Sequence, residues 1–242
     1  MIFLPPTSYL LPPTSSRMQH IGFIMDGNRR WAKKLGNLIK IGHENGEKTF
    51  EKVVEWCYDA DIPFVSFWAL SKENIEERSS EEIEGIYAIL RSSISRLLSL
   101  AEEKNMRIET IWDLWLLPAD IRRSLIDGIE KTRNNTQMTI ILALAYSGQD
   151  EIIRGLRRYI SEWHDVSSLD EKKFLQYLDS GRFPPPDLIV RTGWAMRHSG
   201  YFLYQSAYSE YYFIEKMWPD FTFEDFRKCI DYFASIKRNF WK

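Results

Sequence analysis

Residues 20–32 read His-Ile-Gly-Phe-Ile-Met-Asp-Gly-Asn-Arg-Arg-Trp-Ala, a short apolar run that passes directly into one acid and two arginines. The run Ile21–Met25 has no polar side chain, which is typical of a parallel strand buried on both faces. Further short apolar runs, candidates for strands, lie at Phe64–Ala69, Arg107–Trp112, Thr139–Ala145, Leu188–Arg191 and Tyr211–Ile214. Longer amphipathic stretches separate these runs, so the sequence predicts that strands and helices alternate.

Six stretches outside these runs repeat their apolar residues at helical spacing. They are Glu47–Ala60, Ser80–Lys104, Pro118–Arg133, Asp150–Trp163, Glu171–Leu178 and Thr222–Arg238. Strands that alternate with helices predict right-handed crossovers and a parallel sheet. We therefore expect a single α/β domain over residues 18–242, with a mostly parallel six-stranded sheet flanked by helices. Four prolines within residues 1–17 instead predict an extended, mobile arm.

The composition disfavours several classes of protein. Of 242 residues, 44% are hydrophobic and the formal net charge is -2, which argues against a nucleic-acid binder that works by bulk electrostatics. The longest apolar runs, such as Met138–Ala145, are far shorter than the ~20 residues that span a bilayer. Cys57 and Cys229 form neither a disulfide framework nor a zinc motif, so we expect reduced thiols and a cytoplasmic protein. The sequence also lacks the GxSxG, GxxxxGK[ST] and GxGxxG motifs of hydrolases, P-loops and dinucleotide-binding folds.

The residues that follow the first run are suited to bind phosphate. In open α/β sheets, ligands bind beyond the carboxyl ends of the strands, and residues 26–30 supply one carboxylate, one glycine and two guanidiniums there. Arginine can bind phosphate through two hydrogen bonds, and the start of a following helix favours an anion. Because Asp26 beside a phosphate implies a bridging cation, we expect Mg²⁺. The alternative at this point is a helix-capping turn with solvated arginines.

A second basic cluster follows the fifth run. Arg191, Arg197 and Ser199 can surround a second anion, which would fit an enzyme with two phosphorylated substrates. His43 is either a phosphate contact or a helix-capping histidine. Residues 80–104 are either one wall of a hydrophobic tunnel for a hydrocarbon tail or an ordinary core helix.

Several motifs, in order along residues 20–221, match one family. They are residues 20–32, Gly42-His43, Ser71-Lys72-Glu73-Asn74, Arg191-Thr192-Gly193, Ala207–Phe213 and Trp218–Phe221. With these motifs the chain resembles the cis-prenyltransferases of the undecaprenyl or dehydrodolichyl diphosphate synthase type. The pattern HxxxIMDGNxRWA is highly specific for that family. The resemblance implies the fold predicted above, with a hydrophobic tunnel, in a homodimer.

The resemblance also implies a role for each matching residue. Asp26 would hold Mg²⁺ and help the diphosphate leave, and Glu210 would complete the metal site, in this family often from near a dimer contact. Asn74, with Ser71, would assist proton removal from the acceptor. The allylic diphosphate would contact Gly27, Asn28, Arg29, Arg30 and His43, and the acceptor diphosphate would contact Arg191, Arg197 and Ser199. Further substrate contacts would come from Trp31, Lys72, Glu73 and His198.

Departures from the family pattern cluster on the acceptor side. The usual Gly-Gly-Glu after Arg-Thr is Gly193-Trp194-Ala195 here, and the Asn after Ser199 is Gly200. The basic residue expected at position 77 is Glu77, with Arg78 one position late. The C-terminal Arg-x-Gly is replaced by residues 238–241, Arg-Asn-Phe-Trp. The motif at residues 20–32, which would bind the allylic diphosphate, has no such departure. The changes therefore predict that binding or reaction of the acceptor differs from the family pattern.

From these residues we expect Mg²⁺-dependent prenyl transfer from an allylic prenyl diphosphate to isopentenyl diphosphate, with release of diphosphate. Two other interpretations stay open. One is coupling to a second allylic diphosphate or another nucleophile, and the other is a non-catalytic partner subunit of a prenyltransferase. A generic phosphate-binding domain would require the match at residues 20–32 to be accidental. We expect no nucleic-acid partner, and a long lipid product would add contact with a membrane surface.

Overall fold

The computed structural model describes residues 17–237, apart from 37, 113 and 163–164. The predicted arm over residues 1–17 therefore lies outside the described residues except for Arg17, as do the last residue of the predicted helix Asp150–Trp163 and Arg238. No helix within the described ranges is both long and apolar enough to cross a membrane.

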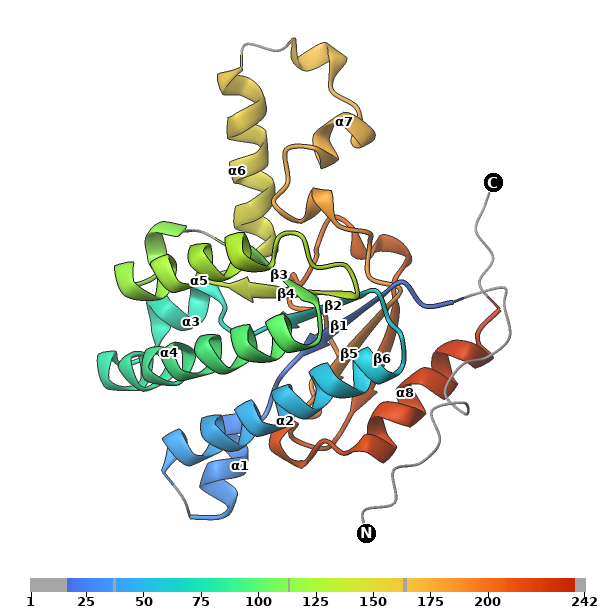
Figure 1. Cartoon of the computed structure of the whole chain (residues 1–242). Coiled ribbons are helices and arrows are strands. Elements are labelled where there is room, and N and C mark those ends of the chain that lie inside the picture. The colour runs from blue at the N-terminus through green and yellow to red at the C-terminus, as the bar shows by residue number, and fades with distance from the viewer. Residues whose placement is uncertain (1–16, 37, 113, 163–164, 238–242) are drawn as a thin grey trace.

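Six parallel strands form one sheet (Figure 1). They are β1 (His20–Ile24), β2 (Phe64–Trp68), β3 (Met106–Trp112), β4 (Met138–Leu144), β5 (Leu188–Thr192) and β6 (Glu210–Ile214). Their order across the sheet is β3-β4-β2-β1-β5-β6, and each neighbouring pair is parallel. The predicted sheet is confirmed, with strand ends that differ by at most one residue.

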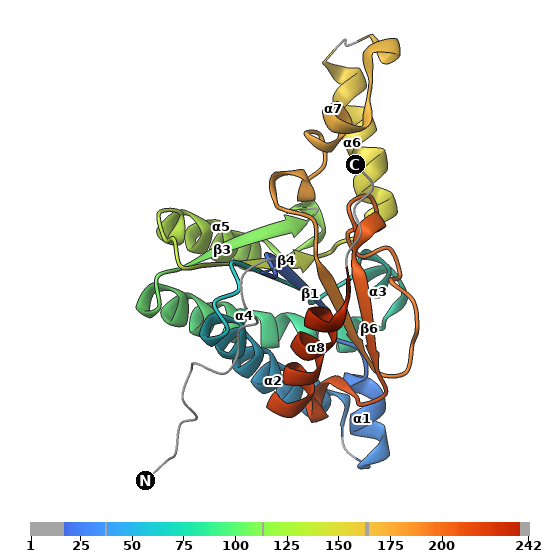
Figure 2. The ribbon, with the colours of Figure 1, turned by 90° about the vertical axis from the view of Figure 1, so that its right-hand side faces the viewer.

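Eight α-helices occupy the described connections and the C-terminal side. They are α1 (Asn28–Lys34), α2 (Ile39–Asp59), α3 (Lys72–Glu77), α4 (Ser80–Glu103), α5 (Ala119–Thr132), α6 (Gly148–Ser161), α7 (Glu171–Leu175) and α8 (Phe223–Ser235). Helices α2, α4, α5 and α8 cover one face of the sheet. In both ribbon views, α6 and α7 project away from this body (Figures 1 and 2).

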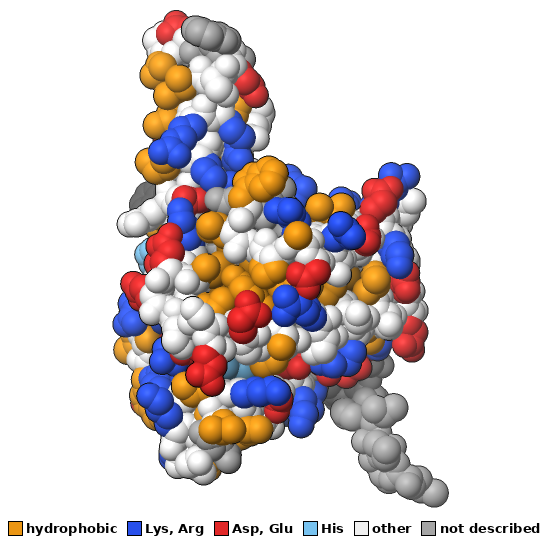
Figure 3. Space-filling view, turned by 90° about the vertical axis from the view of Figure 1, so that its left-hand side faces the viewer, with side chains coloured by type: hydrophobic (Ala, Val, Ile, Leu, Met, Phe, Trp, Pro, Cys, Tyr) orange, Lys and Arg blue, Asp and Glu red, His pale blue; other side chains and the backbone are white. Residues whose placement is uncertain are grey.

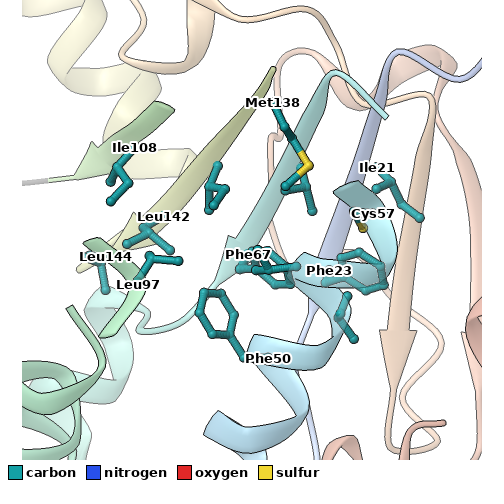
Figure 4. Close-up of a cluster of buried hydrophobic side chains, with 14 of the residues drawn as sticks. Ile21, Phe23, Phe50, Cys57, Phe67, Leu97, Ile108, Met138, Leu142 and Leu144 are labelled. Carbon is teal, nitrogen blue, oxygen red and sulfur yellow. The ribbon is translucent and has the colours of Figure 1, made fainter. Parts of the chain in front are cut away.

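Apolar side chains pack on both faces of the sheet, which explains the uninterrupted apolar runs. Phe23 and Phe67, on neighbouring strands, stack at 5.3 Å between ring centroids, and Phe50 of α2 meets Phe67 edge-on at 4.5 Å (Figure 4). On the opposite face, Ile141 and Ile189 pack in a second, smaller cluster. Packing on both faces therefore holds the sheet rigidly, and with it the residues at the carboxyl ends of the strands.

Some predicted helix boundaries were wrong. Helix α2 begins at Ile39, eight residues before the predicted start, because Gly42 and Gly46 disfavour a helix by propensity but here allow close contact with α1. The short helix α3 was not predicted, since six residues are too few to show a period. Helix α7 ends at Leu175 instead of Leu178, and a 3-10 turn follows at Ser180–Arg182.

Candidate active site

The site lies where the strand order reverses. Strand β1 has β2 on one side and β5 on the other, so the chain connections diverge from β1 in opposite directions. In open α/β sheets such a switch point leaves a crevice outside the carboxyl ends of the strands. Asp26 follows β1 at this point, and Arg191 and Thr192 end β5 beside it. Figure 3 looks onto the side of the molecule to which α1, α3 and α4 extend, and apolar side chains gather at its centre among acidic and basic ones.

Asp26 bonds to arginines from two different elements. Its Oδ1 accepts a hydrogen bond from Arg30 Nη2 at 2.9 Å, and its Oδ2 accepts one from Arg191 Nη2 at 3.1 Å. Its backbone carbonyl accepts from Thr192 Oγ1 at 2.7 Å. Because these bonds come from α1 and β5, the two predicted basic clusters meet at one carboxylate.

The turn after Asp26 depends on a glycine. Gly27 has a φ of 115°, and a Cβ at this position would lie 2.7 Å from Met217 Cβ. Only glycine adopts this backbone conformation without strain and leaves room for Met217. The turn brings the start of α1, with Asn28, back over the crevice.

A basic pocket of about 320 Å³ surrounds the start of α1. It is lined by Met25, Asp26, Gly27, Asn28, Arg29, Arg30, Lys33, His43 and Arg78. Among the described residues, Asn28 Oδ1 and His43 Nε2 are buried without a hydrogen-bond partner. Burial, with Arg78 and Arg29 nearby, lowers the pKa of His43 to about 4, so its imidazole is neutral at pH 7. The guanidiniums, with His43 Nε2 as a donor, fit a bound anion with several oxygen acceptors, whereas Asn28 Oδ1 is itself an acceptor and requires a donor.

Arg78 belongs to this pocket, although its sequence position is one residue late for the family pattern. Its Nη2 donates to Asn74 Oδ1 at 3.0 Å, and its Nη1 lies 3.1 Å from Glu82 Oε1. Glu82 also contacts Arg29, at 3.2 Å, so one carboxylate holds two guanidiniums at the pocket edge. Arg78 was not among the predicted site residues, because the direction of a side chain at the end of a six-residue helix depends on tertiary contacts.

A second cavity of about 490 Å³ adjoins the basic pocket. Its lining includes the predicted residues Asp26, Asn28, His43, Ser71, Glu73, Asn74, Arg191 and Ser199. Ser71 caps α3 by accepting from the Asn74 backbone N–H at 3.1 Å. Arg191 Nη1 donates to Ser199 Oγ and to the Arg197 carbonyl, each at 2.6 Å, while the Arg197 side chain is exposed. The structure therefore brings most of the predicted site residues together.

An apolar pocket continues from this cavity between α2, α4 and the sheet. The two share Met25, Asn28, His43, Ala69 and Ile86. Helix α4 supplies Ile86, Ile89, Leu90, Ser93, Ile94 and Leu97 to the pocket wall. The predicted tunnel wall at residues 80–104 is thus confirmed as the lining of an apolar pocket, and Ala69 and Leu90 lie in it.

Comparison with known proteins identifies the family. Residues 24–241 match the family model described as putative undecaprenyl diphosphate synthase. A geranylgeranyl-diphosphate-specific tritrans,polycis-undecaprenyl-diphosphate synthase of Thermoplasma acidophilum is 37% identical over 93% of this chain and 89% of its own. A lavandulyl diphosphate synthase from Lavandula x intermedia, solved with dimethylallyl diphosphate, superimposes with a TM-score of 0.87 at 27% identity, over 92% of this chain and 97% of that one.

A probable undecaprenyl diphosphate synthase from Campylobacter jejuni superimposes with a TM-score of 0.78 at 31% identity, over 93% and 99% of the two chains. The chain belongs to the cis-prenyltransferase family. It is an enzyme that transfers prenyl groups to give cis-prenyl diphosphates, as the predicted fold and resemblance indicated. The alternative of a non-catalytic partner subunit is therefore not retained.

Five predicted residues of this cis-prenyltransferase do not line the cavities, and one of them is Arg197, whose side chain is exposed. Trp31 donates from Nε1 to Asp220 at 2.7 Å, and Lys72 donates from Nζ to Asp150 of α6 at 2.6 Å. His198 accepts from the Gly200 backbone N–H at 2.9 Å. Glu210 is the first residue of β6 and lies at the amino ends of the strands, whereas Asp26 follows the carboxyl end of β1. The two residues are therefore at least ~10 Å apart along the strands. Glu210 and Asp26 do not meet within one chain, and the prediction that Glu210 completes the metal site from near a dimer contact stays a prediction.

The loop after β5 of this prenyltransferase carries an exposed tryptophan. Trp194 has a φ of 64°, which a bulky side chain rarely adopts, and 52% of its surface is exposed. Its ring lies 6.0 Å from the Arg30 guanidinium, and Arg30 Nη2 also donates to the Gly193 carbonyl at 2.7 Å. Trp194, where the family usually has glycine, thus lies next to Arg30 of the motif at residues 20–32.

Proposed function

We propose that this prenyltransferase joins an allylic prenyl diphosphate to isopentenyl diphosphate in a Mg²⁺-dependent reaction. The single observation that carries the proposal is the meeting of the two basic clusters at Asp26, above an apolar pocket. A cationic site directly beside an apolar one fits a substrate with a diphosphate head and a hydrocarbon tail. The family model and the relatives support the same chemistry.

The allylic half would act by stabilising the leaving group. Cleavage of the allylic C–O bond leaves negative charge on the diphosphate, and preorganised donors stabilise that charge without reorganisation. Arg29, Arg30 and Arg78 supply guanidinium donors, and neutral His43 can donate through Nε2 if that nitrogen carries the proton. The acceptor half would bind the second diphosphate through Arg191, Arg197 and Ser199, with Asn74 near the carbon that loses a proton.

Mg²⁺ fits the residues present. Within the described chain, no cluster of three or more acidic, histidine or cysteine side chains can hold a metal ion. Mg²⁺ commonly binds through one or two carboxylates together with substrate phosphates and water, and Asp26 can supply such a carboxylate. When bound, Mg²⁺ would neutralise charge that develops on the departing diphosphate.

Product analysis tests this function. Purified protein, Mg²⁺ and dimethylallyl diphosphate are incubated with and without isopentenyl diphosphate, and with longer allylic primers, and products are identified by mass spectrometry and NMR. Cis-linked head-to-tail products that require isopentenyl diphosphate are expected. Asp26→Ala should abolish turnover with the fold retained, and Mg²⁺-dependent turnover by that variant would contradict the role of Asp26.

The same incubation tests a second candidate, in which another allylic diphosphate is the acceptor. Trp194 and Ala195 stand where the family usually has Gly and Glu, and the lavandulyl diphosphate synthase is among the structural neighbours. Branched or irregular products from dimethylallyl diphosphate alone would establish that function and exclude simple elongation.

Assembly and location also remain proposals. We propose a homodimer, because β6 forms the edge of the sheet, and the rings of Tyr211 and Phe213 on it stack at 5.9 Å and stay half-exposed. Light scattering of the purified protein tests the dimer, and a monomer at micromolar concentration would contradict it. Cytoplasmic location and membrane contact through a lipid product stay predictions from the sequence.

A further inference from the structure

The apolar pocket is small. Its volume is about 100 Å³, and Phe50, Leu97 and Leu142 line it on the α2, α4 and sheet sides, with Phe67 packed behind Phe50 (Figure 4). An enclosed apolar cavity of about 150 Å³ in a protein takes one benzene molecule. By that measure, the apolar pocket itself holds about one isoprene unit, and the rest of a prenyl chain would lie in the adjoining cavity.

One carboxylate interrupts this apolar wall. Glu47 of α2 lines the pocket although its side chain is only 11% exposed. Its carboxylate accepts from the Ser93 hydroxyl and forms an ion pair with Arg96, both on α4. Arg96 Nε also donates to Glu51 of α2 at 2.8 Å. A poorly hydrated carboxylate is tolerated only with such partners, so these side chains form a polar clasp between α2 and α4, which we define as Glu47, Ser93 and Arg96.

The clasp lies between the apolar pocket and the solvent. On its outer side lies a solvent-facing hollow lined by Lys40, Glu44, Glu47, Lys48, Glu51, Ala88, Ile89, Ser92 and Arg96. Glu47 and Ile89 line both this hollow and the apolar pocket, so at that point a single layer of side chains separates hydrocarbon-lined space from water. A longer chain would have to part α4 from α2 here and bring methylene groups against the Glu47 carboxylate.

We infer that the Glu47–Ser93–Arg96 clasp sets the chain length that the enzyme accepts and restricts it to short prenyl chains. The inference rests on the proposed function and names the substrate class for that same site. Separating the clasp would leave the Glu47 carboxylate without its ion pair and next to hydrocarbon, which opposes opening by longer chains. Loss of the clasp should therefore relax the length limit without touching the diphosphate site.

Binding of unreactive substrate analogues tests the clasp apart from turnover. The probes are the thiolodiphosphate analogues of geranyl and geranylgeranyl diphosphate, measured by calorimetry on the full chain. We expect the wild type to bind the longer analogue about tenfold more weakly or worse, and Glu47→Ala to bring the two Kd values to within a factor of about two. The matched control is Glu44→Ala, because Glu44 lies on the same helix and lines the outer hollow but not the apolar pocket. It should keep the wild-type ratio.

Several outcomes would overturn the inference. Equal binding of both analogues by the wild type would do so, as would an unchanged ratio in folded Glu47→Ala. If that variant does not fold, Glu47→Gln decides the question, since it keeps the volume and loses the ion pair; its ratio must fall in the same direction. A chain-length preference in binding, with no product from any allylic substrate, would overturn the proposed function while leaving the clasp supported.

Discussion

Gly42 and Gly46 determine how closely α2 approaches α1, and Gly42→Ala tests whether that approach positions the site. A Cβ at position 42 would lie 2.2 Å from the Asn28 carbonyl oxygen and 3.0 Å from Ala32 Cβ. A Cβ at position 46 would lie 2.4 Å from Asn28 Oδ1. Atoms do not approach this closely, so an alanine at position 42 must push the first turn of α1 away.

The displacement gives the magnitude. Ordinary carbon–oxygen contact requires the Asn28 carbonyl to move by about 1 Å, and overpacking of this kind typically costs about 1–3 kcal/mol. Alanine in a helix gains about 1 kcal/mol over glycine, which offsets part of that cost. We expect a net destabilisation of up to about 2 kcal/mol. Because Asn28 borders both the basic pocket and the cavity, a shift of about 1 Å should also lower kcat/KM for the allylic substrate by roughly 100-fold.

Gly85→Ala is the matched control. Gly85 lies in α4, and a Cβ there would meet no atom within 4 Å. This variant should gain up to about 1 kcal/mol and keep wild-type activity, because only the helix propensity changes. Thermal unfolding and steady-state kinetics are measured for both variants. A Gly42→Ala enzyme as stable and as active as Gly85→Ala would refute the reasoning that close contact between α1 and α2 holds the allylic site.

Three further predictions follow from individual contacts. Asp150→Asn should remove the ion pair with Lys72 and lower kcat more than it raises the KM for the allylic substrate, because α3 carries Asn74; equal changes in both would show a general structural effect. Arg78→Met should raise the KM for the allylic diphosphate about tenfold or more, and an effect confined to the acceptor would contradict its place in the basic pocket. Burial lowers the pKa of His20 from 6.5 to about 4, so the unfolded chain binds the extra proton, and stability should fall by up to about 3 kcal/mol as pH drops from 6.5 to 4. Denaturant unfolding of His20→Gln should show a shallower fall over that range, and an unchanged pH slope would refute the role of His20.

The sheet was predictable because its strands are short and those inside the sheet are buried on both faces. A run such as Leu188–Arg191 has few alternative placements, and the observed β5 extends it by one residue. Helix α2 was harder, since Gly42 and Gly46 weaken the helical pattern over the very turns that carry His43. Glycine is required at both positions because a larger side chain would clash with Asn28 of α1. A local sequence pattern does not reveal such a tertiary contact.

The site was predictable to the extent that it depends on strand ends. The rule that parallel strands end at one edge places Asp26 near Arg191, and the observed hydrogen bond agrees. Side-chain direction is a different matter. Lys72 lies within a family motif, yet its side chain points to Asp150 on α6. Arg78 points into the pocket because it donates a hydrogen bond to Asn74 and forms an ion pair with Glu82. The order of residues along the chain does not determine these directions.

The charges at the crevice explain how the two halves of the site depend on one another. The lining of the basic pocket includes four cationic side chains and one carboxylate, which gives a net charge of +3 (four minus one) with neutral His43. A diphosphate carries a comparable negative charge, so a diphosphate bound here would neutralise the pocket and compete with Asp26 for Arg30. Asp26 would then keep Arg191 of β5 as its partner. Since Arg191 also holds Ser199, allylic binding should change the position of the acceptor loop through Asp26, and an Asp26 substitution should uncouple the two substrates as well as slow the reaction.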